Sequence, residues 1–145
     1  MSNVNLESRN IPDHFIRHRN FAGELTRRDG LVNDFAFTLV GRGSGQVAIR
    51  SVNFPDRYLR HRDFRIFLEP PASPDDGLWR LDSTFFFERG LADPDALSFR
   101  SVNFPDRYLR HRDFHLWLEP PAGDSDDLFR NDATFYRRPA AVLID

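Results

Sequence analysis

A nearly perfect internal repeat constrains this chain more than any other feature. Residues 51–64 read SVNFPDRYLRHRDF, and the same fourteen residues recur at 101–114, fifty positions later. Chance does not produce an identical stretch of this length. A third and weaker copy, SRNIPDHFIRHRNF, occupies residues 8–21. The chain is therefore built from three related units, and repeats of this period indicate an array in which no unit closes a core alone.

Length and composition place these units in one globular domain. A chain of 145 residues has about the length of a single domain, and its 40% apolar and 14% aromatic residues can build a sizeable core. We therefore expect one domain over residues 1–145, with repeats at about 1–45, 46–94 and 95–145.

The pattern within each unit is one of short strands separated by turns. In the third unit we assign strands to residues 97–102, 108–111, 115–118 and 134–136, with an acidic loop at 123–127. Four strands in each of three units give twelve, and no segment of ten or more residues has helical apolar spacing. Propellers usually have four or more blades, and solenoids use shorter repeats. The sequence thus predicts an all-β fold, a β-trefoil of three four-stranded repeats with pseudo-threefold symmetry.

Charge and residue usage exclude several classes of function. The 20 basic residues, all arginine, are interleaved with 22 acidic ones, so we expect no nucleic-acid partner. No apolar run approaches the length of a membrane span, so we expect no membrane partner. The chain has no cysteine and no phosphate loop. His111 and His115 are four residues apart, but in strand and turn rather than on a helix, so we predict neither a metal site nor a cofactor.

Two motifs of the repeat resemble a known family. The string Asn-Phe-Pro-Asp-Arg-Tyr-Leu-Arg-His, followed about twenty residues later by Asp-Ala-Thr-Phe, resembles the signature of the arabinofuranosidase B (AbfB) domain, the family 42 carbohydrate-binding modules. The resemblance is strong in residues 51–87 and 101–136 and weaker in 8–37. It implies a β-trefoil that binds terminal L-arabinofuranose side chains of arabinoxylan or arabinan and is itself not an enzyme.

The resemblance also implies where the sugar pockets lie. Each would combine the His of the Arg-His step with the Asp of the Asp-Ala-Thr-Phe step. The pairs are His61 with Asp82 and His111 with Asp132, each 21 residues apart. In the first unit His18 and Asp34 are only 16 residues apart and the Ala-Thr step is absent, so the geometry of that pocket is open.

These residue types suit a furanose. A carboxylate accepts hydrogen bonds from two sugar hydroxyls, and an imidazole adds a directional partner. Tyr58, Phe64, Tyr108 and Phe114 are candidates to cover the apolar face of the sugar. Arg62 and Arg112 follow the His where members of the family often have an aromatic residue, so we expect less ring stacking there and a shifted ligand preference.

Other interpretations stay open on the residues alone. Each Asp could equally be a turn former and each His a structural hairpin residue. Nearly identical units argue against an enzyme, because glycoside hydrolysis uses two carboxylates with different tasks, and we predict no catalytic residues. The alternatives are a protein-binding β-trefoil, or an accessory domain of an α-L-arabinofuranosidase with a different glycan ligand. We expect a monomer, secreted as part of a glycosidase, or cytoplasmic if the chain is complete as given.

Overall fold

The computed structural model describes residues 3–140, which form twelve strands and three short helices. The strands are β1 (Asn3–Ser8), β2 (His14–Arg19), β3 (Ala22–Arg27), β4 (Phe37–Gly41), β5 (Gln46–Ser51), β6 (Tyr58–Arg62), β7 (Arg65–Glu69), β8 (Phe85–Arg89), β9 (Leu97–Ser101), β10 (Tyr108–Arg112), β11 (His115–Glu119) and β12 (Phe135–Pro139). The helices are η1 (Val32–Phe35), α1 (Gly77–Asp82) and α2 (Asp127–Asp132). In the described part of the chain, no helix is long and apolar enough to span a bilayer.

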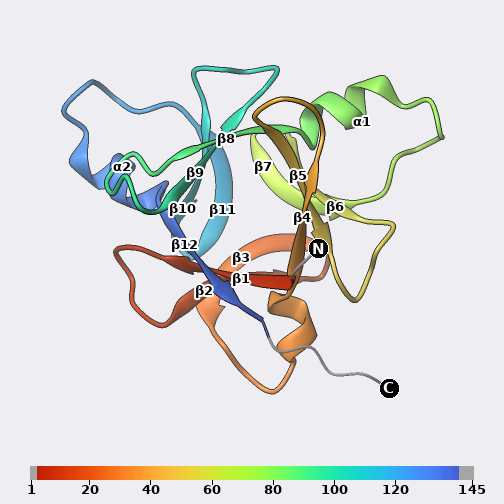
Figure 1. Ribbon diagram of the computed structural model, residues 1–145, viewed down its shortest axis with the longest axis horizontal. Coiled ribbons are helices and arrows are strands. Elements are labelled where there is room, and N and C mark those ends of the chain that lie inside the picture. Colours follow the sequence, from red (N-terminus) through yellow and green to blue (C-terminus); the bar gives the residue numbers. More distant parts are fainter. Residues whose placement is uncertain (1–2, 141–145) are drawn as a thin grey trace.

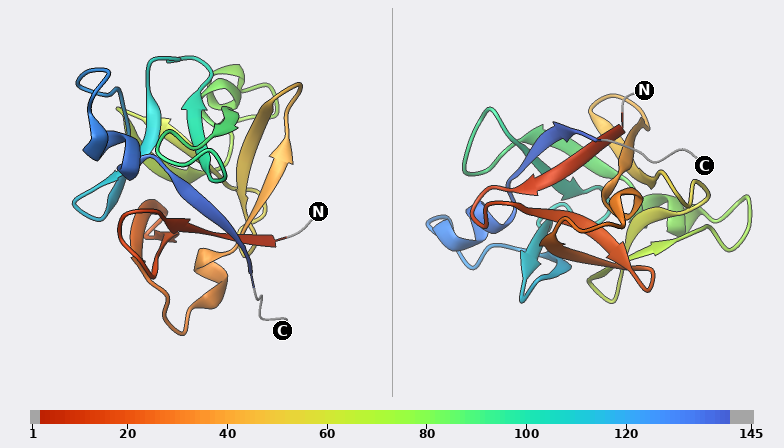
Figure 2. Two further views of the ribbon diagram at one scale, coloured as in Figure 1. Left: turned by 60° about the vertical axis from the view of Figure 1, so that its left-hand side comes forward. Right: turned by 90° about the horizontal axis from the view of Figure 1, so that it is seen from below.

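Six of the strands form a closed barrel. Strands β1, β4, β5, β8, β9 and β12 pair antiparallel in that cyclic order. The first and last strands of the chain close the ring, with the register running from Val4 opposite Pro139 to Ser8 opposite Phe135. Figures 1 and 2 show β1 and β12 side by side, and the three lobes of the molecule around the centre. The predicted β-trefoil of three four-stranded repeats is confirmed.

Three hairpins cover one end of the barrel, and each is tied to the next unit. The hairpins are β2–β3, β6–β7 and β10–β11. Each turn ends in a Phe with positive φ, which a non-glycine residue adopts only at a cost. The carbonyls of these residues accept hydrogen bonds from the following unit in a ring: Phe21 from Leu68, Phe64 from Leu118 and Phe114 from Leu25. The strained turns are therefore held by contacts between units.

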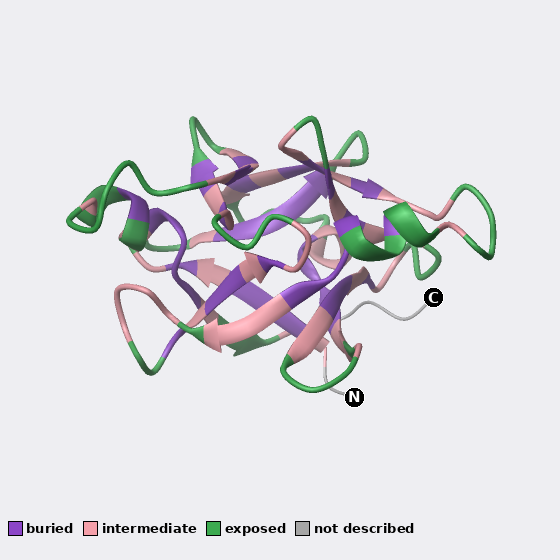
Figure 3. Cartoon of the chain, turned by 90° about the horizontal axis from the view of Figure 1, so that it is seen from above, coloured by how far each residue is buried: buried purple, intermediate pink, exposed green. Residues whose placement is uncertain are grey.

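The core contains equivalent apolar residues from all three units. Figure 3 shows that the buried stretches lie mainly along the strands. Leu25, Leu68 and Leu118 are fully buried at matching positions, as are Ile16, Leu59 and Leu109. At one such position the units differ, because Gly23 corresponds to Ile66 and Leu116. A Cβ atom on Gly23 would lie 2.9 Å from Leu116 Cδ1 and 3.1 Å from Ile66 Cγ2. The core has room for two branched side chains at this level but not for three.

Replacing Gly23 with valine is therefore expected to lower the free energy of unfolding by about 1–3 kcal/mol, the usual cost of overpacking a core. Thermal melts of purified variants measure this. Gly77→Ala is the control, because nothing lies within 4 Å of its new methyl group, and it should melt as the unsubstituted protein does or slightly higher. A Gly23 variant of unchanged stability would contradict the packing described for the core.

The short helices were not predicted, because six residues are too few to show helical periodicity. The end of the expected acidic loop is in fact the start of α2. Asp76 and Asp126 cap the two helices by accepting hydrogen bonds from the backbone N–H groups of Trp79 and Phe129. Backbone N–H bonds lower the pKa of both carboxyls, chiefly the bond from Trp79 for Asp76 and the bond from Ala122, followed by that from Phe129, for Asp126. The helices place Asp82 and Asp132 at their last position, facing the neighbouring strands. The predicted repeat boundaries fall in the β4–β5 and β8–β9 loops, and the division at those points stays a prediction.

Candidate functional site

The structure brings together the predicted His and Asp of every repeat. His Nε2 lies 3.4 Å from Asp Oδ1 in the His61–Asp82 and His111–Asp132 pairs. The distance is 3.6 Å for His18 and Asp34, although their connecting loop is five residues shorter. In that unit η1 takes the place of the α-helix and brings Asp34 to the same position. Three copies of one cluster therefore surround the pseudo-threefold axis.

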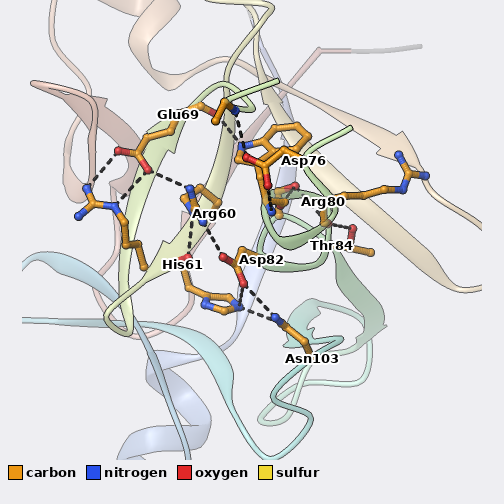
Figure 4. A network of polar contacts seen from close by, with 12 residues as sticks. Arg60, His61, Glu69, Asp76, Arg80, Asp82, Thr84 and Asn103 are labelled. Atoms are coloured by element: carbon orange, nitrogen blue, oxygen red, sulfur yellow. Dashed lines mark hydrogen bonds and ion pairs between the residues drawn. The ribbon is translucent and has the colours of Figure 1, made fainter. Parts of the chain in front are cut away.

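An asparagine from the following unit completes each cluster. Asn103 of the third unit accepts from His61 Nε2 at 2.9 Å and donates to Asp82 Oδ1 at 2.9 Å (Figure 4). Asn53 makes the same two bonds to His18 and Asp34, both at 2.9 Å. Asn10 closes the circle, at 2.8 Å from His111 and 2.7 Å from Asp132. The clusters are thus built across the seams between units, and we call them the seam clusters.

The serine of the repeated Ser-x-Asn motif orients each amide. Ser51 and Ser101 donate to the Oδ1 of Asn53 and Asn103, and Ser8 donates to Asn10, at 2.9–3.1 Å. With Oδ1 facing the ring, each His donates from Nε2. Sequence reasoning missed these asparagines, since it used them only as part of the motif that resembles the family and gave them no role. Their recurrence in all three copies was the available signal.

A buried arginine holds each Asp on its other oxygen. Arg60 donates to Asp82 at 2.5 Å and to Glu69 at 3.2 Å (Figure 4). Arg110 makes the same pair of contacts to Asp132 and Glu119. Arg17 contacts Asp34 at 3.1 Å and Asp29 at 2.8 Å. Each carboxylate is therefore oriented and partly satisfied by its own chain.

The first seam cluster is the most open. Asp34 exposes 20% of its side chain, against 8% for Asp82 and 7% for Asp132. It lines a cavity of about 400 Å³ together with His18, Arg19, Leu31 and other residues of the seam. Phe21 and Phe54 form an edge-to-face pair on its wall, with ring centroids 5.2 Å apart. This cavity has room for a small ring and offers both a carboxylate and apolar faces.

The predicted tyrosines lie elsewhere. Tyr58 packs edge-to-face against Trp79 at 5.2 Å and lines a separate cavity, and Tyr108 packs against Phe129 at 6.1 Å. The rings beside the imidazoles come instead from the following unit: Phe54 is 5.5 Å from His18 and Phe104 is 5.4 Å from His61. The ligand roles of all these residues stay predictions.

Arg62 and Arg112 are engaged by their own chain. Arg62 stacks on Phe67 at 4.1 Å and bonds Glu69, while Arg112 stacks on Trp117 at 4.5 Å and bonds Glu119. Burial acts to raise the pKa of Glu119, but its bonds to Arg112 and the two nearby guanidinium charges lower it overall. Both glutamates thus bridge two arginines of their own unit. Among residues 3–140, no group of His, Asp and Glu side chains has the geometry of a metal site.

The stability of the fold should decrease as the pH falls below the pKa of a free histidine side chain. Burial lowers the pKa of His111, and the Arg110 and His14 charges add to this, although Asp132 opposes them. The folded state therefore keeps the imidazole neutral, and its stabilising contribution is present above about pH 6.5 and lost below it. Thermal melts at about pH 7 and pH 5 should show a smaller difference for His111→Gln than for the unsubstituted protein. Equal differences would contradict this assignment.

Comparison with known proteins identifies the family. The sequence profile of the α-L-arabinofuranosidase B (ABFB) domain matches residues 1–86 and 71–143. No curated protein sequence matches the chain. Among solved structures, an arabinofuranosidase complexed with arabinofuranosyl-α-1,2-xylobiose is 26% identical, with a TM-score of 0.85 over 96% of this chain and 31% of that one. A GH54 α-L-arabinofuranosidase soaked with a cyclic sulfate inhibitor is 24% identical, with a TM-score of 0.83 over the same shares.

The chain spans about a third of the length of these two enzyme chains. A protein described as the BEL β-trefoil is 19% identical, with a TM-score of 0.71 over 96% of this chain and 93% of that one, which supports the fold. The two profile matches overlap and together cover residues 1–143. From its profile match, its repeated motifs and its fold, the chain belongs to the α-L-arabinofuranosidase B domain family.

Proposed function

We propose that this domain binds terminal L-arabinofuranose side chains of arabinoxylan or arabinan, without hydrolysing them, at the seam clusters. The observation that carries the proposal is the recurrence of one His, Asp and Asn arrangement at all three seams. Equivalent sites suit multivalent capture of a branched polysaccharide, because several weak sites on one particle raise avidity. The family and the arabinofuranosyl ligand in the similar enzyme structure support the same ligand class.

The chemistry of the clusters agrees with a small polyol. Each Asp oxygen has two lone pairs, so a carboxylate that already accepts from Arg and Asn can still accept from a sugar hydroxyl. A sugar hydroxyl that donates to such a carboxylate makes a charge-assisted hydrogen bond. In the first cluster, Phe21 and Phe54 would cover the C–H face of the ring. We infer that this open cluster is occupied most readily.

The same contacts argue against hydrolysis. A glycosidase of the usual kind needs one protonated and one ionised carboxyl on opposite sides of the scissile bond. Here Arg60 and Arg110 each bridge the two nearest carboxylates, Asp82 with Glu69 and Asp132 with Glu119. Both carboxylates of each pair are therefore bonded to the same arginine, and the arrangement does not set one apart as the acid and the other as the base or nucleophile.

Calorimetric titration with arabinoxylan, and with the same xylan after enzymatic removal of its arabinose, tests the ligand class. We expect binding to the first polysaccharide and at least about tenfold weaker binding to the second. Incubation with 4-nitrophenyl α-L-arabinofuranoside should release no nitrophenol. Equal binding to both xylans would refute the ligand, and binding of neither would favour a protein partner. Nitrophenol release abolished by one Asp substitution would show that the domain is an enzyme.

A further inference from the structure

A second cavity lies in the second unit, away from the seam clusters. Its volume is about 480 Å³, and its lining includes Arg42, Tyr58, Trp79 and Arg80, together with the carboxylate Asp56. Arg42 comes from the β4–β5 loop, Tyr58 from β6, and Trp79 and Arg80 from α1. The cavity therefore combines two guanidinium groups with two aromatic rings.

Neither guanidinium has a carboxylate partner in the described part of the chain. Arg42 stacks on Tyr58 and Trp79 at 5.0 and 5.1 Å. It donates through Nη1 to Arg80 O at 3.0 Å and to Ser83 Oγ and Thr84 Oγ1, both at 2.8 Å. A hydrogen bond with Tyr58 uses part of the remaining Nε and Nη2 donors, and the other N–H groups are available to a ligand. No carboxylate in residues 3–140 lies within ion-pair distance of either guanidinium, Asp56 included. Burial and the nearby charge of Arg80 lower the pKa of Arg42, as expected for two neighbouring guanidinium groups that have no carboxylate between them.

The third unit supplies an internal comparison. There Arg100 lies opposite Tyr108 in the sheet, as Arg50 lies opposite Tyr58. Arg100 bonds both oxygens of Glu88, at 3.0 and 2.9 Å. By register, the place of Glu88 is taken in the second unit by Val40, which lines the cavity. The counterpart of Arg80, Arg130, lies 3.6 Å from Asp127. The second unit thus has Val40 and Gly77 where the third has the carboxylates of Glu88 and Asp127.

We propose that this cavity binds a sugar that carries a carboxylate, a uronic acid residue, with Arg42 and Arg80 contacting its carboxylate. Arginine is the side chain best matched to a planar anion. Tyr58 offers an apolar face for the pyranose ring, and Asp56 an acceptor for its hydroxyls. The volume suits a single sugar unit. The choice of a sugar over an acidic peptide rests on the proposed function; the anion site itself does not.

The test compares two probes that differ only in the carboxylate. The first is a xylo-oligosaccharide bearing one glucuronic acid, and the second is the same molecule after reduction of the carboxyl to an alcohol. We expect the acidic probe to bind at least about fivefold more tightly, since a charge-assisted contact is lost on reduction. Arg80→Gln should abolish the difference. The matched Arg130→Gln in the third unit should retain it. Arg80 is exposed and its guanidinium forms no ion pair in the described part of the chain, so its replacement should leave the fold intact.

Equal affinity for both probes, or no effect of Arg80→Gln, would overturn the proposal. A glutamate-rich peptide that binds through Arg80 more tightly than the acidic probe would replace the sugar by a protein partner. Binding of a neutral arabinofuranosyl xylo-oligosaccharide separates this proposal from the proposed function. Arg80→Gln should leave the binding of this neutral probe unchanged. If the unsubstituted protein does not bind the neutral probe, the seam sites are refuted, and the uronic acid site is still judged by the two acidic and reduced probes.

Discussion

Replacing Asp82 with alanine is expected to lower the free energy of unfolding by about 2–4 kcal/mol, because it removes charge-assisted hydrogen bonds at a buried position. The substitution removes one acceptor of Arg60, which keeps its contact with Glu69, and it removes the acceptor of the Asn103 amide. For a domain of this size the melting temperature should fall by about 10 °C. Chemical denaturation monitored by circular dichroism measures the loss.

Two further variants control that experiment. Asp132→Ala removes the same contacts in the third unit and should cost a similar amount. Asp75→Ala removes an exposed carboxylate that forms no ion pair in the described chain, and should change stability by less than about 0.5 kcal/mol. If the Asp82 variant is as stable as the Asp75 variant, the Asp82 carboxylate does not contribute to the free energy of unfolding. The cost also means that loss of binding in Asp82→Ala cannot by itself identify a ligand contact.

A chain ending after Gly90, which lacks the third unit, should not fold. It loses two of the six barrel strands, the pairing of β1 with β12, and the bond from Leu118 that holds the strained carbonyl of Phe64. The rest cannot close around the remaining apolar side chains. Size-exclusion chromatography and thermal melts should show an aggregated or unfolded chain. A soluble fragment with a cooperative transition would contradict the shared core.

A circular permutant provides the control. The backbone N–H of Ala140 donates to Asn3 O at 3.1 Å, so a short linker can join the two ends while a new break opens the Gly43–Gly45 turn. This permutant keeps every unit and seam and should melt cooperatively, because break points in exposed turns are generally tolerated. If neither the truncated chain nor the permutant folds, the loss of folding results from breaking the chain rather than from the missing third unit.

The sequence was sufficient for the fold because its information is repeated. Three copies with the same strand and turn pattern leave few closed arrangements, and a pairing of His61 with Asp82 followed from the family motif. The position of Asp34 could not be predicted in the same way, because its loop is shorter. In the first unit η1 stands where the other units have an α-helix, and it places Asp34 near His18.

The contacts between units were beyond sequence reasoning. Nothing local to Asn103 indicates that its amide reaches His61 of the preceding unit, because that contact depends on closure of the whole ring. The alternatives considered for Asp82 were a ligand contact and a turn, whereas the structure adds a buried ion pair with Arg60. Tyr58 was assigned to the sugar pocket by proximity along the strand, but the pleat and the position of α1 direct it to another cavity.

Side-chain amide signals of the seam asparagines give the most direct test of the proposed sites, because the experiment needs no destabilising substitution. The protein, labelled with ¹⁵N, is titrated with an arabinofuranosyl xylo-oligosaccharide, and the Nδ2 protons of Asn10, Asn53 and Asn103 are followed by NMR. Each lies against a cluster Asp. If arabinofuranose binds at the seams, these signals should shift in proportion to occupancy, that of Asn53 at the lowest sugar concentration, and the unsubstituted xylo-oligosaccharide should shift none of them. Saturable binding that leaves all three signals in place would show that the seam clusters hold the trefoil together and that the sugar binds elsewhere.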